Sequence, residues 1–180
     1  ASSLNLPFIG VNHLEGHALS PKLHTKLDFP YLLLLISGGH SQYLSVNGLG
    51  KYKRLGTTID DAIGEAFDKA ARLMGMRSSG NGGAAIEVSA KQGKIVRDFN
   101  LRVPMRNRKD CNFSYAGLKN QFRVAVEKVR KQYNLTSRTS NAPVESMQMV
   151  LKESIVSLPS QVQADLSATF QDVAFSHIED

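Results

Sequence analysis

The segment YLLLLISGGHSQYLSVNGLGKYKRLG, residues 31–56, constrains the fold of this chain more than any other stretch. Its opening run YLLLLI is far shorter than the ~20 apolar residues of a membrane helix and has the length of a buried strand. Residues 41–46 alternate in polarity, as a strand with one covered face does. A Gly-Gly turn separates the two runs, and Asn47-Gly48 favours a second hairpin turn. The sequence therefore predicts strands joined by tight turns.

Helical periodicity is clearest in TTIDDAIGEAFDKAARLMG, where Thr58 and Asp61 resemble a capping box. Further helices are expected in AAIEVSAKQG, in SYAGLKNQFRVAVEKVRKQY and from Val162 onward. Ahead of the strands, residues 8–11 should form a short strand that runs into a helix capped by Asn12. Together these elements indicate an α/β protein.

The charge is uneven along the chain. The whole sequence carries a net charge of +6, but residues 91–138 contain 13 basic and three acidic residues. Such a stretch can attract a nucleic-acid backbone by releasing counterions, although a solvated surface explains it equally well from charge alone. The single cysteine, Cys111, excludes an intrachain disulfide and is expected to be a small buried side chain rather than a nucleophile. Residues 134–160 contain a polar stretch that is interpreted as an inserted or linker segment.

His13 and His17 lie four positions apart in GVNHLEGHALS. On a helix they are separated by about 40°, so both imidazoles can reach one metal ion. An incidental surface pair is the alternative that this spacing leaves open. Glu15 would lie about 200° from His13, which excludes it as the general base of an H-E-x-x-H protease. Because a zinc site needs at least three protein ligands, a further ligand must come from elsewhere.

Two glycine turns flank the clearest helix. The first, Ser37-Gly38-Gly39, follows a strand and would let backbone N–H groups approach a phosphate, although a plain hairpin turn fits equally well. The second lies in GNGGAAIE and opens a helix, a natural anion site. Between them, Gly64 costs ~1 kcal/mol relative to alanine and indicates close packing or ligand approach. The same helix carries a mainly acidic face with three carboxylates and one arginine: Asp61, Glu65, Asp68 and Arg72. This combination suggests a nucleotide held in a cleft.

Six motifs, spread over residues 6–175, resemble one family: NHLEGHALS, LISGGHSQ, TTIDDAIGEAFDKAARLMG, GGAAIE, NFSYAGLK and ADLSATFQ. This is the universal tRNA threonylcarbamoyladenosine synthase family, whose bacterial catalytic subunit is TsaD. The resemblance implies an actin-like, Hsp70-like ATPase fold with ribonuclease-H-like lobes. It also implies transfer of threonylcarbamoyl from threonylcarbamoyl-AMP to the adenosine next to the anticodon in tRNAs that read ANN codons.

The resemblance assigns roles to individual residues. His13 and His17 would be ligands of one divalent metal ion, iron or zinc. The nucleotide, threonylcarbamoyl-AMP or ATP, would contact eight residues: Leu35, Ile36, Ser37, Gly38, Gly39, Asp68, Gly83 and Glu87. The basic stretch would dock tRNA, and a separate enzyme would supply the adenylate. No catalytic side chain is assigned.

The chain departs from the family in two respects. The family has about a hundred residues before the equivalent of Ala1 and a further segment after Asp180, so residues 1–180 should form its central part and be inactive alone. The second glycine turn is about two residues longer than the usual PGGP.

His40 is typical of the bacterial and organellar branch, and the polar segment from Leu135 to Ser160 is similar to fungal mitochondrial members. The resemblance therefore implies a mitochondrial homodimer, with a cytoplasmic location as the alternative.

Two other functions remain open at this point. A nucleotide-binding regulatory module could keep the fold without transferase chemistry, although such relatives lose the two histidines. A metalloprotease is the more distant alternative, because it requires a correctly placed glutamate.

Overall fold

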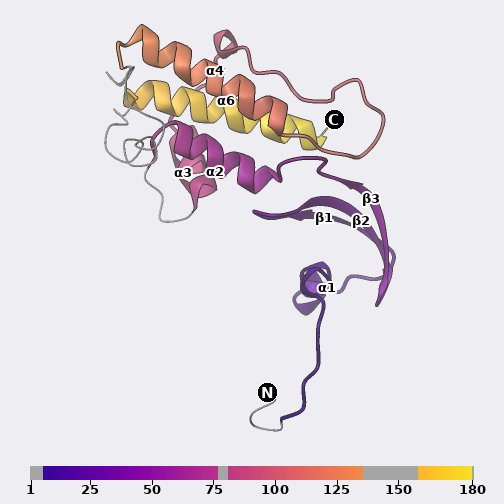
Figure 1. Ribbon diagram of the computed structural model, residues 1–180. Helices are drawn as coiled ribbons and strands as arrows, with labels where there is room; N and C mark the ends of the chain where they lie inside the picture. Colours follow the sequence, from indigo (N-terminus) through magenta and orange to yellow (C-terminus); the bar gives the residue numbers. More distant parts are fainter. Residues whose placement is uncertain (1–5, 77–80, 136–157, 180) are drawn as a thin grey trace, which may run out of the picture.

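The computed structural model describes residues 6–76, 81–135 and 158–179. The elements are α1 (His13–Leu19), η2 (Ser20–Leu23), β1 (Tyr31–Ile36), β2 (Ser41–Gly48), β3 (Lys51–Thr57), α2 (Ile63–Leu73), α3 (Gly82–Ala90), η3 (Arg97–Phe99), α4 (Ala116–Gln132) and α6 (Ser160–Glu179). Helices α2, α3, α4 and α6 pack together beside the sheet, and α1 lies apart from them (Figure 1). The protein is thus a mixed α/β structure.

The three strands form one antiparallel sheet in the order β1-β2-β3. The first pair is in register from Tyr31 opposite Val46 to Ile36 opposite Ser41, which confirms the predicted turn at Gly38-Gly39. The second turn lies at Leu49-Gly50, two residues beyond the predicted Asn47-Gly48, because Gly48 still pairs with Lys51. Gly50 adopts φ 67°, a left-handed conformation that glycine accepts without strain.

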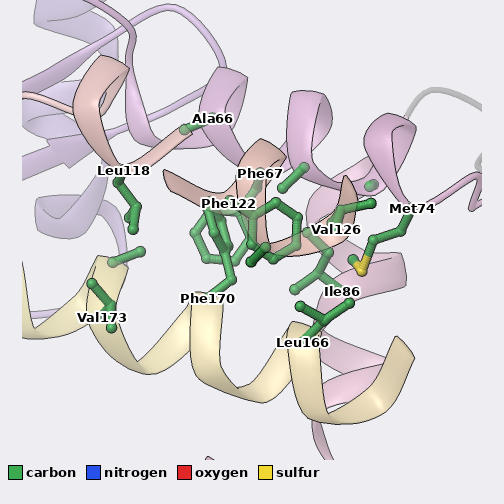
Figure 2. Close-up of a cluster of buried hydrophobic side chains, with 14 of the residues drawn as sticks. Ala66, Phe67, Met74, Ile86, Leu118, Phe122, Val126, Leu166, Phe170 and Val173 are labelled. Carbon is green, nitrogen blue, oxygen red and sulfur yellow. The ribbon is translucent and has the colours of Figure 1, made fainter. Parts of the chain in front are cut away.

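The main core lies between the helices. Figure 2 shows Phe67 of α2, Phe122 of α4 and Phe170 of α6 meeting at its centre. The ring centroids of Phe67 and Phe170 are 5.1 Å apart in an edge-on pair, and those of Phe122 and Phe170 are 4.8 Å apart. Since Phe170 is fully buried, its truncation to alanine would cost about 3–5 kcal/mol. This core holds α2 and α3, the helices that carry Asp68, Gly83 and Glu87 of the predicted nucleotide residues.

The apolar period that predicted α2 is confirmed, because Leu73 is partly buried and the other apolar positions of the period are buried: Ala62, Ile63, Ala66, Phe67, Ala70 and Met74. The predicted capping box is wrong. Thr58 Oγ1 instead donates to the carbonyl of Asp61, and Ala62 precedes the helix without a side-chain cap. The Ile63 N–H donates to the buried Ser41 hydroxyl at 2.9 Å. A serine of β2 thus caps the helix from outside the local sequence.

Three further expectations need correction or lie beyond the described part. Residues 8–11 form no strand in the described structure, and Phe8 and Ile9 are 81% and 85% exposed. A short apolar run becomes a strand only where a partner edge is available. Cys111 is exposed rather than buried. Most of the predicted linker at 134–160 falls at 136–157, outside the described residues.

Candidate functional site

Helix α1 brings the two histidines together. Asn12 caps it as predicted, since its Oδ1 accepts from the N–H groups of Leu14 and Glu15 at 2.9 and 3.1 Å. The Nε2 atoms of His13 and His17 face one another at 2.8 Å. On a tetrahedral ion with bonds of about 2.1 Å, two ligand nitrogens are about 3.4 Å apart, so only a small opening of the pair is needed. The two donors therefore fit one metal ion.

Among the described residues, no group of three or more His, Cys, Asp or Glu side chains could hold a metal ion. The described part of the chain thus supplies two converging donors, His13 and His17, and no third one beside them.

Glu15 bonds to the β2–β3 hairpin. Its Oε1 accepts from the N–H of Gly50 at 3.1 Å and from the hydroxyl of Tyr52 at 2.7 Å. Desolvation and then this hydrogen bond raise the pKa of the Tyr52 hydroxyl. Glu15 thus fastens α1 to the β2–β3 turn. Its carboxylate is therefore bonded to the hairpin and not to the histidine pair.

The first glycine turn, Ser37–His40, closes on itself. The Ser37 N–H donates to the carbonyl of His40 at 2.8 Å. The Ser37 Oγ accepts from the N–H groups of Gly39 and His40 at 3.3 and 3.0 Å. A phosphate placed here would compete with the serine hydroxyl for those two donors. A Cβ built on Gly38 or Gly39 meets nothing within 4 Å, so a ligand has room to approach the turn.

Helix α2 packs directly against this turn. A Cβ at Gly64 would lie 2.7 Å from the Ser37 carbonyl oxygen and 2.9 Å from the Gly38 Cα. No side chain larger than hydrogen fits that gap. The prediction that Gly64 marks a close approach is confirmed, and the approaching group is the backbone of the glycine turn.

The second glycine turn meets α2 one helical turn further on. Asp68 Oδ1 accepts from the Gly82 N–H at 2.8 Å, and a Cβ at Gly82 would lie 2.8 Å from the Asp68 Cα. Gly64 and Asp68 are four residues apart, about 6 Å along one face of the helix. The structure therefore brings the two glycine turns to neighbouring positions on α2.

The remaining predicted nucleotide residues lie around these turns. Leu35 and Ile36 end β1, where Leu35 is buried and Ile36 is 44% exposed. Gly83 follows Gly82 in the first turn of α3, and a Cβ there would have ordinary contacts only. Glu87 forms an exposed ion pair with Lys91 at 2.9 Å. Of the eight residues, Glu87 is the one engaged by a surface cation.

The histidine pair and the glycine turn are fastened to opposite ends of β1. Tyr31, at the start of the strand, donates its hydroxyl to the carbonyl of Ala18 in α1 at 2.7 Å. The glycine turn follows Ile36 at the other end, five strand steps or about 17 Å away. The described residues therefore hold the two predicted sites at separate places on one sheet.

Ion pairs engage part of the basic stretch. Arg108 pairs with Asp110 at 2.5 Å, and Lys119 pairs with Asp61 at 2.6 Å. The hydrogen bond from Lys119 holds the pKa of the Asp61 carboxyl below its usual 3.8, although desolvation acts in the opposite direction. The segment 102–110 still carries four basic residues and one acidic residue. We call it the basic loop.

Asp60 is the residue that sequence reasoning missed. Its carboxylate accepts from the Ser114 hydroxyl at 2.5 Å and from the N–H groups of Tyr115 and Ala116 at 2.8 and 3.2 Å. It therefore caps α4 across more than fifty residues of sequence. The only hint in the sequence is that NFSYAGLK opens a helix without an acidic residue of its own.

No helix in the described part of the chain is both long and apolar enough to cross a membrane.

Comparison with known proteins gives a consistent result. The model of the TsaD family, described as tRNA N6-adenosine threonylcarbamoyltransferase, matches residues 1–180. A Pelagibacter ubique protein of that name is 62% identical over 73% of this chain and 35% of its own length. A Paramagnetospirillum magneticum protein of the same name is 55% identical over 67% of this chain and 34% of its own. An Arabidopsis thaliana protein, whose name adds the word mitochondrial, is 42% identical over 100% of this chain and 34% of its own. The chain thus spans about a third of the length of these curated relatives.

Proposed function

Because the chain belongs to the tRNA N6-adenosine threonylcarbamoyltransferase family, we propose that the protein containing it makes threonylcarbamoyladenosine in tRNA. The threonylcarbamoyl group passes from threonylcarbamoyl-AMP to the N6 amine of the adenosine next to the anticodon in tRNAs that read ANN codons. The amine attacks the carbamoyl carbon, AMP leaves, and the amine loses a proton. The observation that carries the proposal is the meeting of both glycine turns on one face of α2, at Gly64 and Asp68.

The chain's own residues bind and orient the adenylate. The N–H groups of Gly39 and His40 exchange the Ser37 hydroxyl for the adenylate phosphate. Asp68 bonds the start of α3, the helix that carries Gly83 and Glu87. Backbone donors held in this way stabilise the charge on the leaving phosphate without reorganising during the reaction.

His13 and His17 would hold one divalent ion. Their Nε2 atoms already converge, and imidazole nitrogen suits both iron and zinc. When bound, such an ion would supply Lewis acidity. The two histidines would hold it, and Glu15 bonds α1 to the β2–β3 turn.

We also propose a fold and a domain assignment, which the same membership supports. We assign the sheet and its helices to one lobe of an actin-like, Hsp70-like ATPase fold with ribonuclease-H-like topology and additional helices. The antiparallel β1-β2-β3 order is compatible with that lobe. Residues 1–180 form the central part of the whole protein, and residues 134–160 form an insertion in it.

The basic loop and α4 form the tRNA surface, where the net positive charge supports contact with phosphates. An adenylate-producing enzyme supplies the substrate, and the protein acts as a homodimer. His40 and the Arabidopsis relative that matches the whole chain support a mitochondrial location, with a cytoplasmic location as the alternative.

The test is transfer by the whole protein to unmodified tRNA, given threonine, bicarbonate, ATP and an adenylate-producing enzyme. Mass spectrometry of the digested tRNA should find threonylcarbamoyladenosine. If the protein binds ATP and tRNA but forms no modified adenosine, the regulatory-module alternative replaces this proposal.

A further inference from the structure

The segment 57–63, which links β3 to α2, contacts both predicted binding sites. On the side of the glycine turn, the Thr58 N–H donates to the carbonyl of Ser41 at 2.8 Å. The Ile63 N–H donates to the Ser41 hydroxyl, which is only 2% exposed. Ser41 directly follows the turn, and Gly64 touches the turn itself. Movement of the turn is therefore transmitted to the start of α2.

The same segment is bonded to the end of the basic loop. Asn112 Oδ1 accepts from the Thr57 N–H at 3.1 Å. The Asn112 N–H donates to Asp110 Oδ1 at 3.0 Å, and Asp110 pairs with Arg108. A continuous set of hydrogen bonds thus runs from a basic-loop arginine to Thr57.

The backbones of the two segments also lie against each other. Thr58 and Phe113 form a parallel bridge, in which the Ile59 N–H donates to the Phe113 carbonyl and the Phe113 N–H donates to the Thr57 carbonyl. A Cβ at Gly56 would lie 1.7 Å from the carbonyl oxygen of Cys111, so there is no space between the chains. Residues 56–59 and 111–113 are therefore packed against each other without a gap.

Asp60 lies in the same linking segment. Its carboxylate accepts three hydrogen bonds, from Ser114 and Tyr115 just before α4 and from Ala116, the first residue of α4. The Ser114 N–H in turn donates to Nε2 of His177, which is 7% exposed in α6. Asp60 is exposed, and two of its three hydrogen bonds lie at the surface. Together with the Lys119–Asp61 ion pair, they tie the start of α4 to the segment.

From this network we propose that Asp60 is a positioning residue that couples nucleotide binding at the glycine turn to tRNA binding at the basic loop. The inference rests on the proposed function, because it assigns the two ligands to the two sites. A phosphate that takes the Gly39 and His40 donors releases the Ser37 hydroxyl and shifts the turn. The shift passes through Ser41 to the 57–63 segment, which holds the stretch after the basic loop by Asn112 and by the hydrogen bonds of Asp60 to Ser114, Tyr115 and Ala116. By linkage, tRNA must strengthen nucleotide binding by the same factor as nucleotide strengthens tRNA binding.

The test is a binding cycle on the whole protein. Calorimetry gives the affinity for a non-hydrolysable ATP analogue with and without saturating unmodified tRNA. In the unaltered protein the two values should differ by about 5-fold to 150-fold, the usual range for coupled sites. Asp60→Ala should lower that ratio, because it removes three hydrogen bonds between the segment and residues 114–116, while each single-ligand affinity changes by less than about threefold. Asp60→Asn should keep part of the ratio, because its amide oxygen still accepts from two backbone N–H groups.

Glu127→Ala is the matched control. It removes one carboxylate from α4, where Glu127 forms an exposed pair with Arg123, and it should leave the ratio unchanged. Ser114→Ala removes one of the three bonds to Asp60 and serves if Asp60→Ala does not fold. An unaltered protein without coupling, or an Asp60→Ala or Ser114→Ala variant with the full ratio, overturns the inference. Either result leaves the transfer reaction itself standing, and loss of transfer with coupling intact contradicts only the proposed function.

Discussion

Replacing Gly64 with alanine tests the contact between α2 and the glycine turn. The new Cβ would lie 2.7 Å from the Ser37 carbonyl oxygen, 2.9 Å from the Gly38 Cα and 3.0 Å from the Gly38 nitrogen. All three are backbone atoms, so no flexible side chain can move aside. The helix start must therefore move away from the turn, or the turn must open.

The net effect follows from two opposing terms. Alanine in place of glycine favours a helix by up to about 1 kcal/mol. Overpacking of a closed contact costs typically about 1–3 kcal/mol. Gly117 gives the matched control, because it is likewise the second residue of its helix and a Cβ there meets nothing within 4 Å. Gly117→Ala should be neutral or stabilising, and Gly64→Ala should be less stable than it by about 2 kcal/mol.

Urea unfolding of the two variants, followed by circular dichroism, measures this difference. Titration with an ATP analogue should also show weaker binding by Gly64→Ala alone, because the displaced turn carries the phosphate donors. Equal stabilities and equal nucleotide affinities for the two variants would refute the packing argument.

Two further perturbations test the electrostatics. Replacing Arg106, Arg108 and Lys109 with glutamate should weaken tRNA binding and flatten its salt dependence. Each lost phosphate contact lowers the slope of log affinity against log salt concentration by about one. An unchanged slope would show that the basic loop is not part of the tRNA surface. The lowered pKa of Asp61 means that its bond with Lys119 adds stability above pH 3.8 and loses it as the pH falls further. Urea midpoints of Asp61→Asn should therefore vary less with pH in the acid range than those of the unaltered protein, and parallel profiles would contradict this.

Much of the fold was predictable because its signals are local. The apolar period of α2 and the Asn12 cap of α1 need only neighbouring residues, and the structure confirms both. The β2–β3 turn was misplaced because Asn47-Gly48 is a strong local signal, whereas the register of the pair extends the strand past it. Residues 8–11 have strand-like composition, but no strand forms in the described structure without a paired edge.

Some residues of the proposed site stood out in the sequence, but their connections did not. Gly64 stood out as a glycine inside a helix, and Asp68 was assigned by the resemblance. The structure gives their close contacts, and nucleotide binding by Asp68 stays a prediction. The roles of Asp60 and Ser41 depend on partners that are 22 to 56 residues away, at positions that no helical or strand period relates. Glu15 could be excluded as a base from its angle on the helix, but its actual partners, Gly50 and Tyr52, required the hairpin to be in place.

The central claim is that the histidine pair serves a threonylcarbamoyl transferase. The direct measurement compares the whole protein with its His13→Ala/His17→Ala double variant, by metal content and by threonylcarbamoyl transfer to unmodified tRNA. Glu15→Gln is the control, because its amide oxygen can still accept from Gly50 and Tyr52 while the two metal donors stay unchanged. We expect the double variant to fold and to bind tRNA, but to lack the metal and to form no modified adenosine. Glu15→Gln should keep both the metal and the activity. Normal transfer by the double variant would contradict it.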